Sequence, residues 1–230
     1  MGPYLHTGGL CNVIDYAAFI RQHTDLMVVP LVPEVKLHLA HEAIPIWQKT
    51  EVELGQMGLP PPFWAFAWAG GQALARYILD HADIVRGKTV LDLASGSGLV
   101  GIAALKAGAA SVLAADIDAF AIAACKINSF ANHVEMCVTQ ENVLYVSPPN
   151  VDVILVGDLF YESSTAEQCL RFLYQSSARI LIGDPGRRYL PKEELEKLAT
   201  YSVPVSRDLE DAEFKQTSVW RLQSQVPHQD

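Results

Sequence analysis

Three glycines within LDLASGSGLVGIAAL (residues 91–105) are spaced as in loops that bind an adenosine-containing cofactor. Gly96, Gly98 and Gly101 form the pattern G-x-G-x-x-G, and Asp116 follows Gly96 at the distance expected of a ribose-binding acid. Glycine lets the chain turn tightly after a strand and lets a ligand approach the backbone. The glycines alone are compatible with a dinucleotide or with another adenosine cofactor.

The acid that precedes the glycines separates these two possibilities. Asp92 lies shortly before Gly96, at the end of an apolar segment. A carboxylate there would repel the pyrophosphate of a dinucleotide, which prefers the free amides of a helix N-terminus. The same carboxylate suits a ligand that carries an ammonium and a sulfonium. We therefore favour S-adenosylmethionine over a nicotinamide cofactor.

Polar residues also follow the later apolar segments. Asp116 comes after SVLAA and is expected to bind both ribose hydroxyls, whereas Asp118 is expected to cap the next helix. Asn142 could read the adenine amino group or lie in a solvated loop. Asp158 and Tyr161 follow the next apolar segment, at the sheet edge where open α/β folds bind ligands.

Apolar segments alternate with helical ones from residue 63 onward, which predicts a mostly parallel sheet covered by helices on both faces. We predict an α/β, Rossmann-like domain over residues 61–223, an N-terminal appendage with a helix and a hairpin over 1–60, and a loose tail over 224–230. The last two expected strands are predicted to pair with each other as an antiparallel edge of the sheet. The expected strands are 35–40, 44–47, 89–93, 111–115, 134–138, 151–156, 179–182 and 217–222, and the expected helices are 15–22, 71–81, 99–107, 120–132, 166–175 and 191–199.

Composition and charge exclude several classes of function. The chain has 230 residues, of which 50% are hydrophobic, and a net charge of −9 at pH 7. This acidic balance argues against a nucleic-acid partner held by phosphate contacts. No apolar run approaches the ~18 residues of a membrane span, so no membrane partner is expected.

Cysteine usage and the N-terminal sequence indicate an intracellular protein. The four cysteines contain no C-x-x-C pair, which argues against a disulfide framework or a zinc site. The spacing of His38, His41 and Glu42 is similar to that of metal ligands. Strand residues three apart point to opposite faces of a sheet, so we predict no bound metal. No secretory signal or transit peptide is apparent. We expect a cytoplasmic location in a bacterium; the mitochondrial matrix would be the eukaryotic alternative.

Four segments together resemble one family of protein methyltransferases. Residues 158–161, DLFY, match the family's acid-x-x-aromatic signature, and residues 62–74, 182–187 and 217–220 resemble three further segments. The chain looks like the lysine methyltransferases that modify the β-subunit of electron transfer flavoprotein, whose bacterial members are often labelled as nicotinamide N-methylases. The resemblance covers about residues 33–222. It departs from the family at Ala69, where relatives commonly have proline, and in the cofactor loop at Ala94 and Ser97.

The resemblance implies a class I methyltransferase with a seven-stranded sheet, S-adenosylmethionine as cofactor, the flavoprotein β-subunit as protein substrate, and a monomer. Asp158 would orient the amine, Tyr161 would wall the cavity and Trp68 would cover the cofactor. Two alternatives stay open: a small-molecule N-methyltransferase acting on a nicotinamide-like ring, and a non-catalytic interaction module. The expected catalytic residues are Asp158 and Tyr161; the cofactor-binding residues are Trp68, Gly71, Asp92, Ala94, Gly96, Gly98, Asp116, Ile117, Asn142 and Asp158; the substrate contacts are Phe160, Asp184, Gly186 and Arg187.

Overall fold

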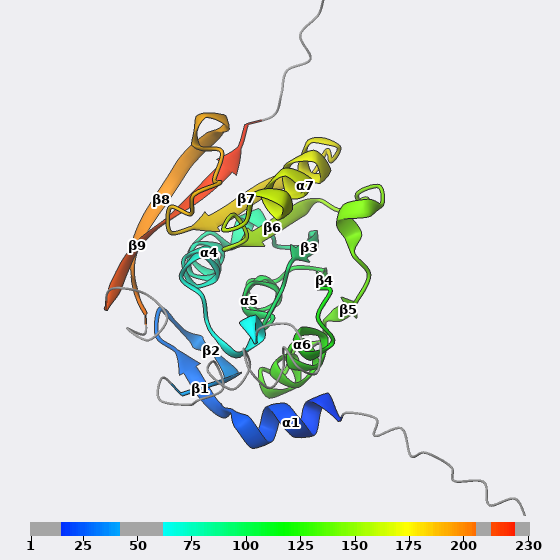
Figure 1. Ribbon diagram of the computed structural model, residues 1–230, viewed down its shortest axis with the longest axis vertical. Helices are drawn as coiled ribbons and strands as arrows, with labels where there is room; N and C mark the ends of the chain where they lie inside the picture. The colour runs from blue at the N-terminus through cyan, green and yellow to red at the C-terminus, as the bar shows by residue number, and fades with distance from the viewer. Residues whose placement is uncertain (1–14, 42–61, 206–212, 224–230) are drawn as a thin grey trace, which may run out of the picture.

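A seven-stranded sheet forms the centre of the computed structural model, which describes residues 15–41, 62–205 and 213–223. Its strands lie in the order β5-β4-β3-β6-β7-β9-β8 (Figure 1). β3 to β7 pair in parallel, and β9 pairs antiparallel with both β7 and β8. The predicted mostly parallel sheet with an antiparallel edge is confirmed. The strands are β3 (Thr89–Leu93), β4 (Ser111–Ala115), β5 (Cys137–Thr139), β6 (Val153–Gly157), β7 (Arg179–Asp184), β8 (Leu195–Pro204) and β9 (Phe214–Leu222).

Helices cover both faces of this sheet, as the continuous apolar strands require. The helices α4 (Ala69–Asp80), α5 (Leu99–Lys106) and α6 (Ala119–Ala131) form a row along one side, and α7 (Ser163–Tyr174) lies on the other (Figure 1). Within β6, Leu155 faces the core under α4 and α5, whereas Ile154 and Val156 face the core under α7. The carboxyl ends of β3, β4 and β6 thereby meet at one edge.

An N-terminal segment with a helix and a β-hairpin packs against the helices α4, α5 and α6 on one face of the sheet. It consists of α1 (Tyr16–His23), β1 (Asp25–Val29) and β2 (Val32–Leu39), with β1 and β2 antiparallel. The predicted strand at 35–40 is confirmed, but its partner is the preceding β1. The segment 44–47, which we had expected to pair with it, lies outside the described residues. Apolar and polar residues do not alternate along β1, because its exposed positions include the apolar residues Leu26 and Val28.

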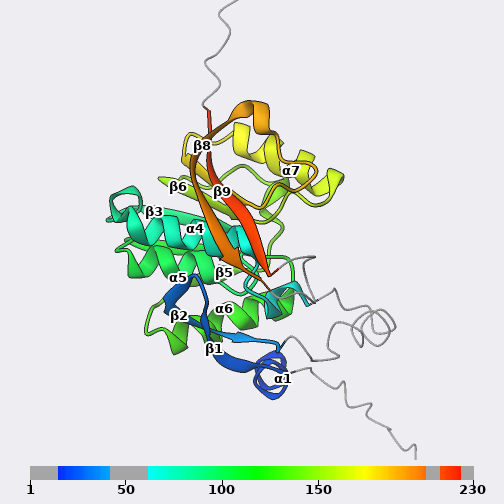
Figure 2. The same ribbon diagram turned by 90° about the vertical axis from the view of Figure 1, so that its left-hand side faces the viewer.

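This appendage shares a core with the helices that cover the sheet. Val35, Leu37 and Leu39 of β2 are buried against α4 and α5. Two asparagines, Asn128 within α6 and Asn132 at its C-cap, accept the backbone N–H groups of His38 and Lys36 at 2.8 and 3.0 Å. Figure 2 shows α1, β1 and β2 gathered beside α5 and α6.

The predicted helix over 191–199 is wrong. Its start signals are used by a single 3-10 turn at Lys192–Glu194, and the chain then runs as β8 with a largely alternating burial pattern. Pairing from Leu195↔Leu222 to Pro204↔Phe214 holds it against β9. A long-range pairing therefore overrides a local helix signal. Across the part of the chain that the structure describes, no helix is long and apolar enough to cross a membrane.

Candidate functional site

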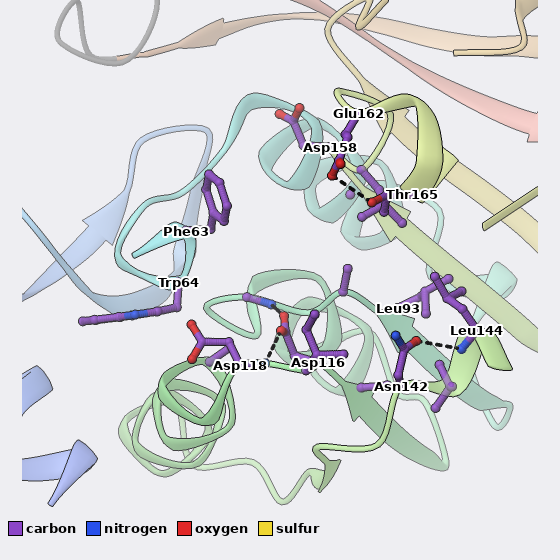
Figure 3. Close-up of a pocket in the computed structure, with 18 of the residues that line it drawn as sticks. Phe63, Trp64, Leu93, Asp116, Asp118, Asn142, Leu144, Asp158, Glu162 and Thr165 are labelled. Carbon is purple, nitrogen blue, oxygen red and sulfur yellow. Dashed lines mark hydrogen bonds between the residues drawn. The ribbon is translucent and has the colours of Figure 1, made fainter. Parts of the chain in front are cut away.

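A cavity of about 470 Å³ opens at the carboxyl ends of β3, β4 and β6. Asp158 and Glu162 lie on one side of the hollow, and Asp116 and Asp118 lie on the opposite side (Figure 3). The cavity combines a mostly apolar lining with a few converging acids, as ligand sites do. Nine of the sequence-predicted site residues line it: Trp68, Ala94, Gly96, Asp116, Ile117, Asn142, Asp158, Tyr161 and Arg187.

The glycine loop between β3 and α5 forms one wall of the cavity. Ala94, Gly96 and Gly98 have φ values of 54°, 51° and 80°, so the loop runs repeatedly through the left-handed region. A Cβ on Gly98 would lie 3.1 Å from Met136 Cε and 3.2 Å from Cys125 Sγ, which explains the absence of a side chain there. Gly98 itself does not line the cavity; it turns the chain into α5.

Asp116 is held in place by the backbone before any ligand binds. Its Oδ2 accepts the Gly96 N–H at 2.8 Å and its Oδ1 accepts the Asp118 N–H at 3.0 Å. Each carboxylate oxygen has a second lone pair, so the group can still accept two hydroxyls. Burial raises the pKa of Asp116, and the backbone hydrogen bonds oppose that shift.

Asp118 caps α6 as expected, by accepting the Phe120 N–H at 2.9 Å, and it also lines the cavity. Burial raises its pKa to about 6, and the charge of Asp116 adds to the effect. Asp118, which was expected only to cap a helix, therefore also places a second acid beside Asp116 in the cavity lining.

Asp92 lies beneath the glycine loop and does not line the cavity. Its side chain is buried, and its Oδ2 accepts the Gly101 N–H of α5 at 2.8 Å. Burial raises the pKa of this carboxyl to about 8, and the Gly101 hydrogen bond only partly offsets that shift. Asp92, the residue on which the sequence-based preference for S-adenosylmethionine over a nicotinamide cofactor rests, thus supports the first turn of α5.

Asp158 occupies the junction of β6, α4 and β7. Its backbone is left-handed, with φ 58°, and its N–H donates to Gly183 O at 2.9 Å. Its Oδ2 accepts the Gly70 N–H from the start of α4 at 3.0 Å, and its Oδ1 accepts the Arg187 Nε–H at 2.6 Å. The N-cap of α7 is Glu162, so Asp158 does not have that simpler structural role.

The turn after β7 fixes Arg187 in front of Asp158. The Oδ1 of Asp184 accepts the backbone N–H groups of Gly186 and Arg187 at 2.6 and 2.7 Å, and Gly186 has φ 96°. Burial raises the pKa of Asp184 to about 6. Asp184 and Gly186 do not line the cavity. They contribute to it by holding the backbone of Arg187, which does line it.

Two further predicted residues pack inside the protein. Phe160 is fully buried in the core beside α7, and Gly71 packs close to Leu99 and Val100. Neither lines the cavity. Both residues have packing roles in this structure, beneath the surface of the cavity.

Aromatic side chains border the mouth of the cavity. The ring of Phe63 lies 6.0 Å from that of Trp68 and 5.7 Å from that of Tyr161, and Trp68 Nε1 donates to Phe63 O at 2.8 Å. Tyr161 is 47% exposed, so it can contact a ligand from solvent.

Eight further residues line the cavity although sequence reasoning assigned them no role there. Some are neighbours in the chain of predicted site residues, such as the apolar residues directly after Asn142, and that proximity was the only signal for them in the sequence. They are Leu93, Ala115, Ala121, Val143, Leu144, Glu162, Thr165 and Gln168.

The sheet order, the glycine loop and the acid after β4 define the class of protein. Residues 72–158 match the family model "Ribosomal protein L11 methyltransferase (PrmA)". The magnesium protoporphyrin IX methyltransferase of Synechocystis, solved with bound S-adenosylmethionine, has the same fold, with a TM-score of 0.51 and 10% identity over 77% of this chain and 84% of that one. The fold is that of the class I methyltransferases.

Curated relatives narrow this class to one family. The chain is 37% identical over 215 residues to the electron transfer flavoprotein beta subunit lysine methyltransferase of Xenopus laevis, covering 90% of this chain and 86% of that protein. It is 35% identical over 222 residues to the human protein of the same name, covering 91% and 82%. The chain belongs to the electron transfer flavoprotein beta subunit lysine methyltransferase family.

Proposed function

We propose that this protein transfers a methyl group from S-adenosylmethionine to lysine side chains of the electron transfer flavoprotein β-subunit. The observation that carries the proposal is one cavity walled both by Asp116, which would bind the ribose, and by Asp158, which would receive the amine. The names of the family members supply the protein substrate.

The cofactor half of the cavity fits S-adenosylmethionine. Gly96 and Ala94 present backbone to the ligand, Asp116 would accept the ribose hydroxyls, and Ile117 and Asn142 would flank the adenine. When bound, this cofactor supplies an electrophilic methyl group on a positively charged sulfur. Asp92 would support the binding loop from below through Gly101.

The substrate half must receive a lysine nitrogen with its lone pair available. The ordinary lysine pKa is about 10.4, so the amine loses a proton to water before it reacts. Asp158 would accept a hydrogen bond from the neutral amine and aim its lone pair, and Tyr161 would confine the side chain. Positioning of this kind provides much of the rate of an in-line transfer.

Mass spectrometry of the purified β-subunit after reaction tests the proposal. We expect the subunit to gain the mass of whole methyl groups on lysine, and a short peptide around the same lysine to react far more slowly, because one lysine resembles another and selection needs a wider surface. Asp158→Asn should remove most of the activity. Asp83→Asn, an exposed acid on the 3-10 turn after α4, should not. Cofactor binding without any mass gain would refute the substrate assignment.

The aromatic border supports a second candidate, a small N-heterocyclic substrate. Phe63, Trp68 and Tyr161 could stack against such a ring. Incubation with nicotinamide and labelled cofactor distinguishes the two candidates, because methylnicotinamide would form in the absence of any protein substrate. Turnover of either substrate would exclude a purely non-catalytic module.

A further inference from the structure

Arg187 is the only lysine or arginine among the described residues that line the cavity. Five acids line the same walls: Asp116, Asp118, Glu141, Asp158 and Glu162. The Arg187 Nε–H donates to Asp158 Oδ1 at 2.6 Å, and the side chains of the two residues are 22% and 4% exposed. The cavity therefore pairs its one basic side chain with the acid that faces the proposed amine.

An acidic cavity presents a difficulty for amine methylation. A carboxylate within ~4–6 Å favours the charged form of a basic group by about 1–3 pKa units. Asp158 without a counter-ion would therefore stabilise the lysine ammonium, which has no lone pair for the reaction. The surrounding acids would add to this effect.

The charged and titratable groups around Asp158 come from several elements. Asp184 lies at the end of β7, Glu162 and Tyr161 follow β6, and Asp116 follows β4. At the first turn of α4, the Gly70 N–H contacts the second carboxylate oxygen. Among these described neighbours Arg187 alone is cationic, so it sets the net charge that an incoming amine meets.

The turn after β7 holds Arg187 in position for this role. Asp184 accepts the backbone N–H groups of both Gly186 and Arg187, and the Tyr189 N–H donates to Phe160 O at 3.2 Å. The guanidinium thus projects from a backbone tied to the core on both sides. It can stay beside Asp158 while that carboxylate accepts a further hydrogen bond.

We propose that Arg187 is a positioning residue that neutralises Asp158, so that the carboxylate binds the target amine in its uncharged form. This inference rests on the proposed lysine substrate. The lysine ammonium gives its proton to water, and the nitrogen lone pair then forms the N–C bond as the C–S bond breaks and its electron pair stays on sulfur. The methylated ammonium product loses its proton to water before any further transfer.

The pH dependence of kcat, which reports ionisations in the enzyme–substrate complex, tests this role. The wild-type chain, Arg187→Gln and Arg187→Lys are assayed on the flavoprotein β-subunit from neutral pH to about pH 10.5, close to the ordinary lysine value. We expect Arg187→Gln to move the midpoint of the acidic limb upward by about one pH unit, which lowers the neutral rate about ten-fold and leaves the alkaline plateau within a few-fold of wild type. Arg187→Lys keeps the charge and should restore the wild-type midpoint.

Two controls separate this role from a structural one. Arg188→Gln changes the neighbouring arginine, whose guanidinium lies over the Tyr189 ring and outside the cavity lining, and should leave the profile unchanged. Calorimetry should give the same S-adenosylmethionine affinity for all variants. If Arg187→Gln does not bind the cofactor, Arg187→Met, with its unbranched and uncharged side chain, replaces it.

Each remaining outcome decides a different question. A rate lowered equally at every pH would overturn the inference and leave Arg187 with a structural role. A rate raised at every pH would also overturn it, because Arg187 would then be an obstacle that the lysine displaces. Wild-type turnover with an unchanged midpoint in Arg187→Gln would refute the inference alone. No wild-type turnover on the subunit would retire the proposed function and the inference together.

Discussion

Replacing Asn128 with alanine should weaken both the fold and the cofactor site. Asn128 is fully buried on α6, and its amide joins two distant segments. Its Oδ1 accepts the His38 N–H of β2 at 2.8 Å, and its Nδ2 donates to Ser97 O of the glycine loop at 2.9 Å. Each of these two groups costs ~1–3 kcal/mol when left unpaired, so Asn128→Ala should lower the free energy of unfolding by about 2–6 kcal/mol. Loss of the Ser97 contact alone should weaken S-adenosylmethionine binding by about 1 kcal/mol.

Asn132 supplies a matched control one turn further along α6. Its Oδ1 accepts the Lys36 N–H at 3.0 Å, and its Nδ2 donates to Lys36 O and Asn128 O at 2.5 and 2.8 Å. None of these bonds, within the part of the chain that the structure describes, reaches the glycine loop. Asn132→Ala should therefore lower stability by a similar amount and leave cofactor affinity unchanged. Urea denaturation and calorimetry measure the two quantities. The reasoning is refuted if Asn128→Ala costs less than ~0.5 kcal/mol, or if both variants weaken the cofactor equally.

Three further changes test other parts of the site. Asp116→Ala should weaken S-adenosylmethionine binding by ~1–3 kcal/mol in calorimetry, and undiminished affinity would remove this residue from the ribose site. Gly70→Ala would place a Cβ 2.3 Å from Gly183 O and should cost several-fold more stability in denaturant titrations than Gly71→Ala, whose Cβ would meet ordinary contacts at 3.7 Å; equal losses would contradict this packing. The pKa of Asp92 is raised from 3.8 to about 8, so the folded protein holds this proton more tightly than the unfolded chain, and its contribution to stability is complete below 3.8 and lost as the pH rises through 8. Asp92→Asn should flatten that decline in thermal melts, and an unaltered decline would assign it to other groups.

The central sheet could be predicted from the sequence because its strands are apolar on both faces. The segment VILVG of β6 is buried on both faces of the sheet. An apolar run of this length between two helical segments indicates a central strand of a parallel sheet. The glycine loop and Asp116 were predictable for a related reason. In such folds the residues that contact a ligand come directly after the strands, so locating the strands also locates these residues.

What the sequence could not supply depends on contacts between distant residues. The helix-start signals after Pro191 produce only a single 3-10 turn, and the residues that follow form β8 because they pair with β9. The burial of Asp92 depends on the pleat of β3, in which Leu91 and Leu93 face α7 while Asp92 faces Gly101 of α5. The ion pair between Asp158 and Arg187 joins residues that follow two different strands, β6 and β7, and has no local signature in the sequence.

The docking of β2 onto α5 and α6 has a consequence for synthesis on the ribosome. His38 contacts Asn128 across 90 residues of chain, and the core partners of Val35 and Leu37 lie in helices made long after β2. At about 5–20 residues per second, translation of the 66 residues from Leu37 to Ala103 of α5 leaves the apolar side of β2 without those partners for about 3–13 s. The hairpin is made first but reaches its final place only after α6 has left the exit tunnel. Until then the apolar side of β2 is open to non-native contacts, so slow translation before α6 should lower the yield of folded protein more than slow translation after it.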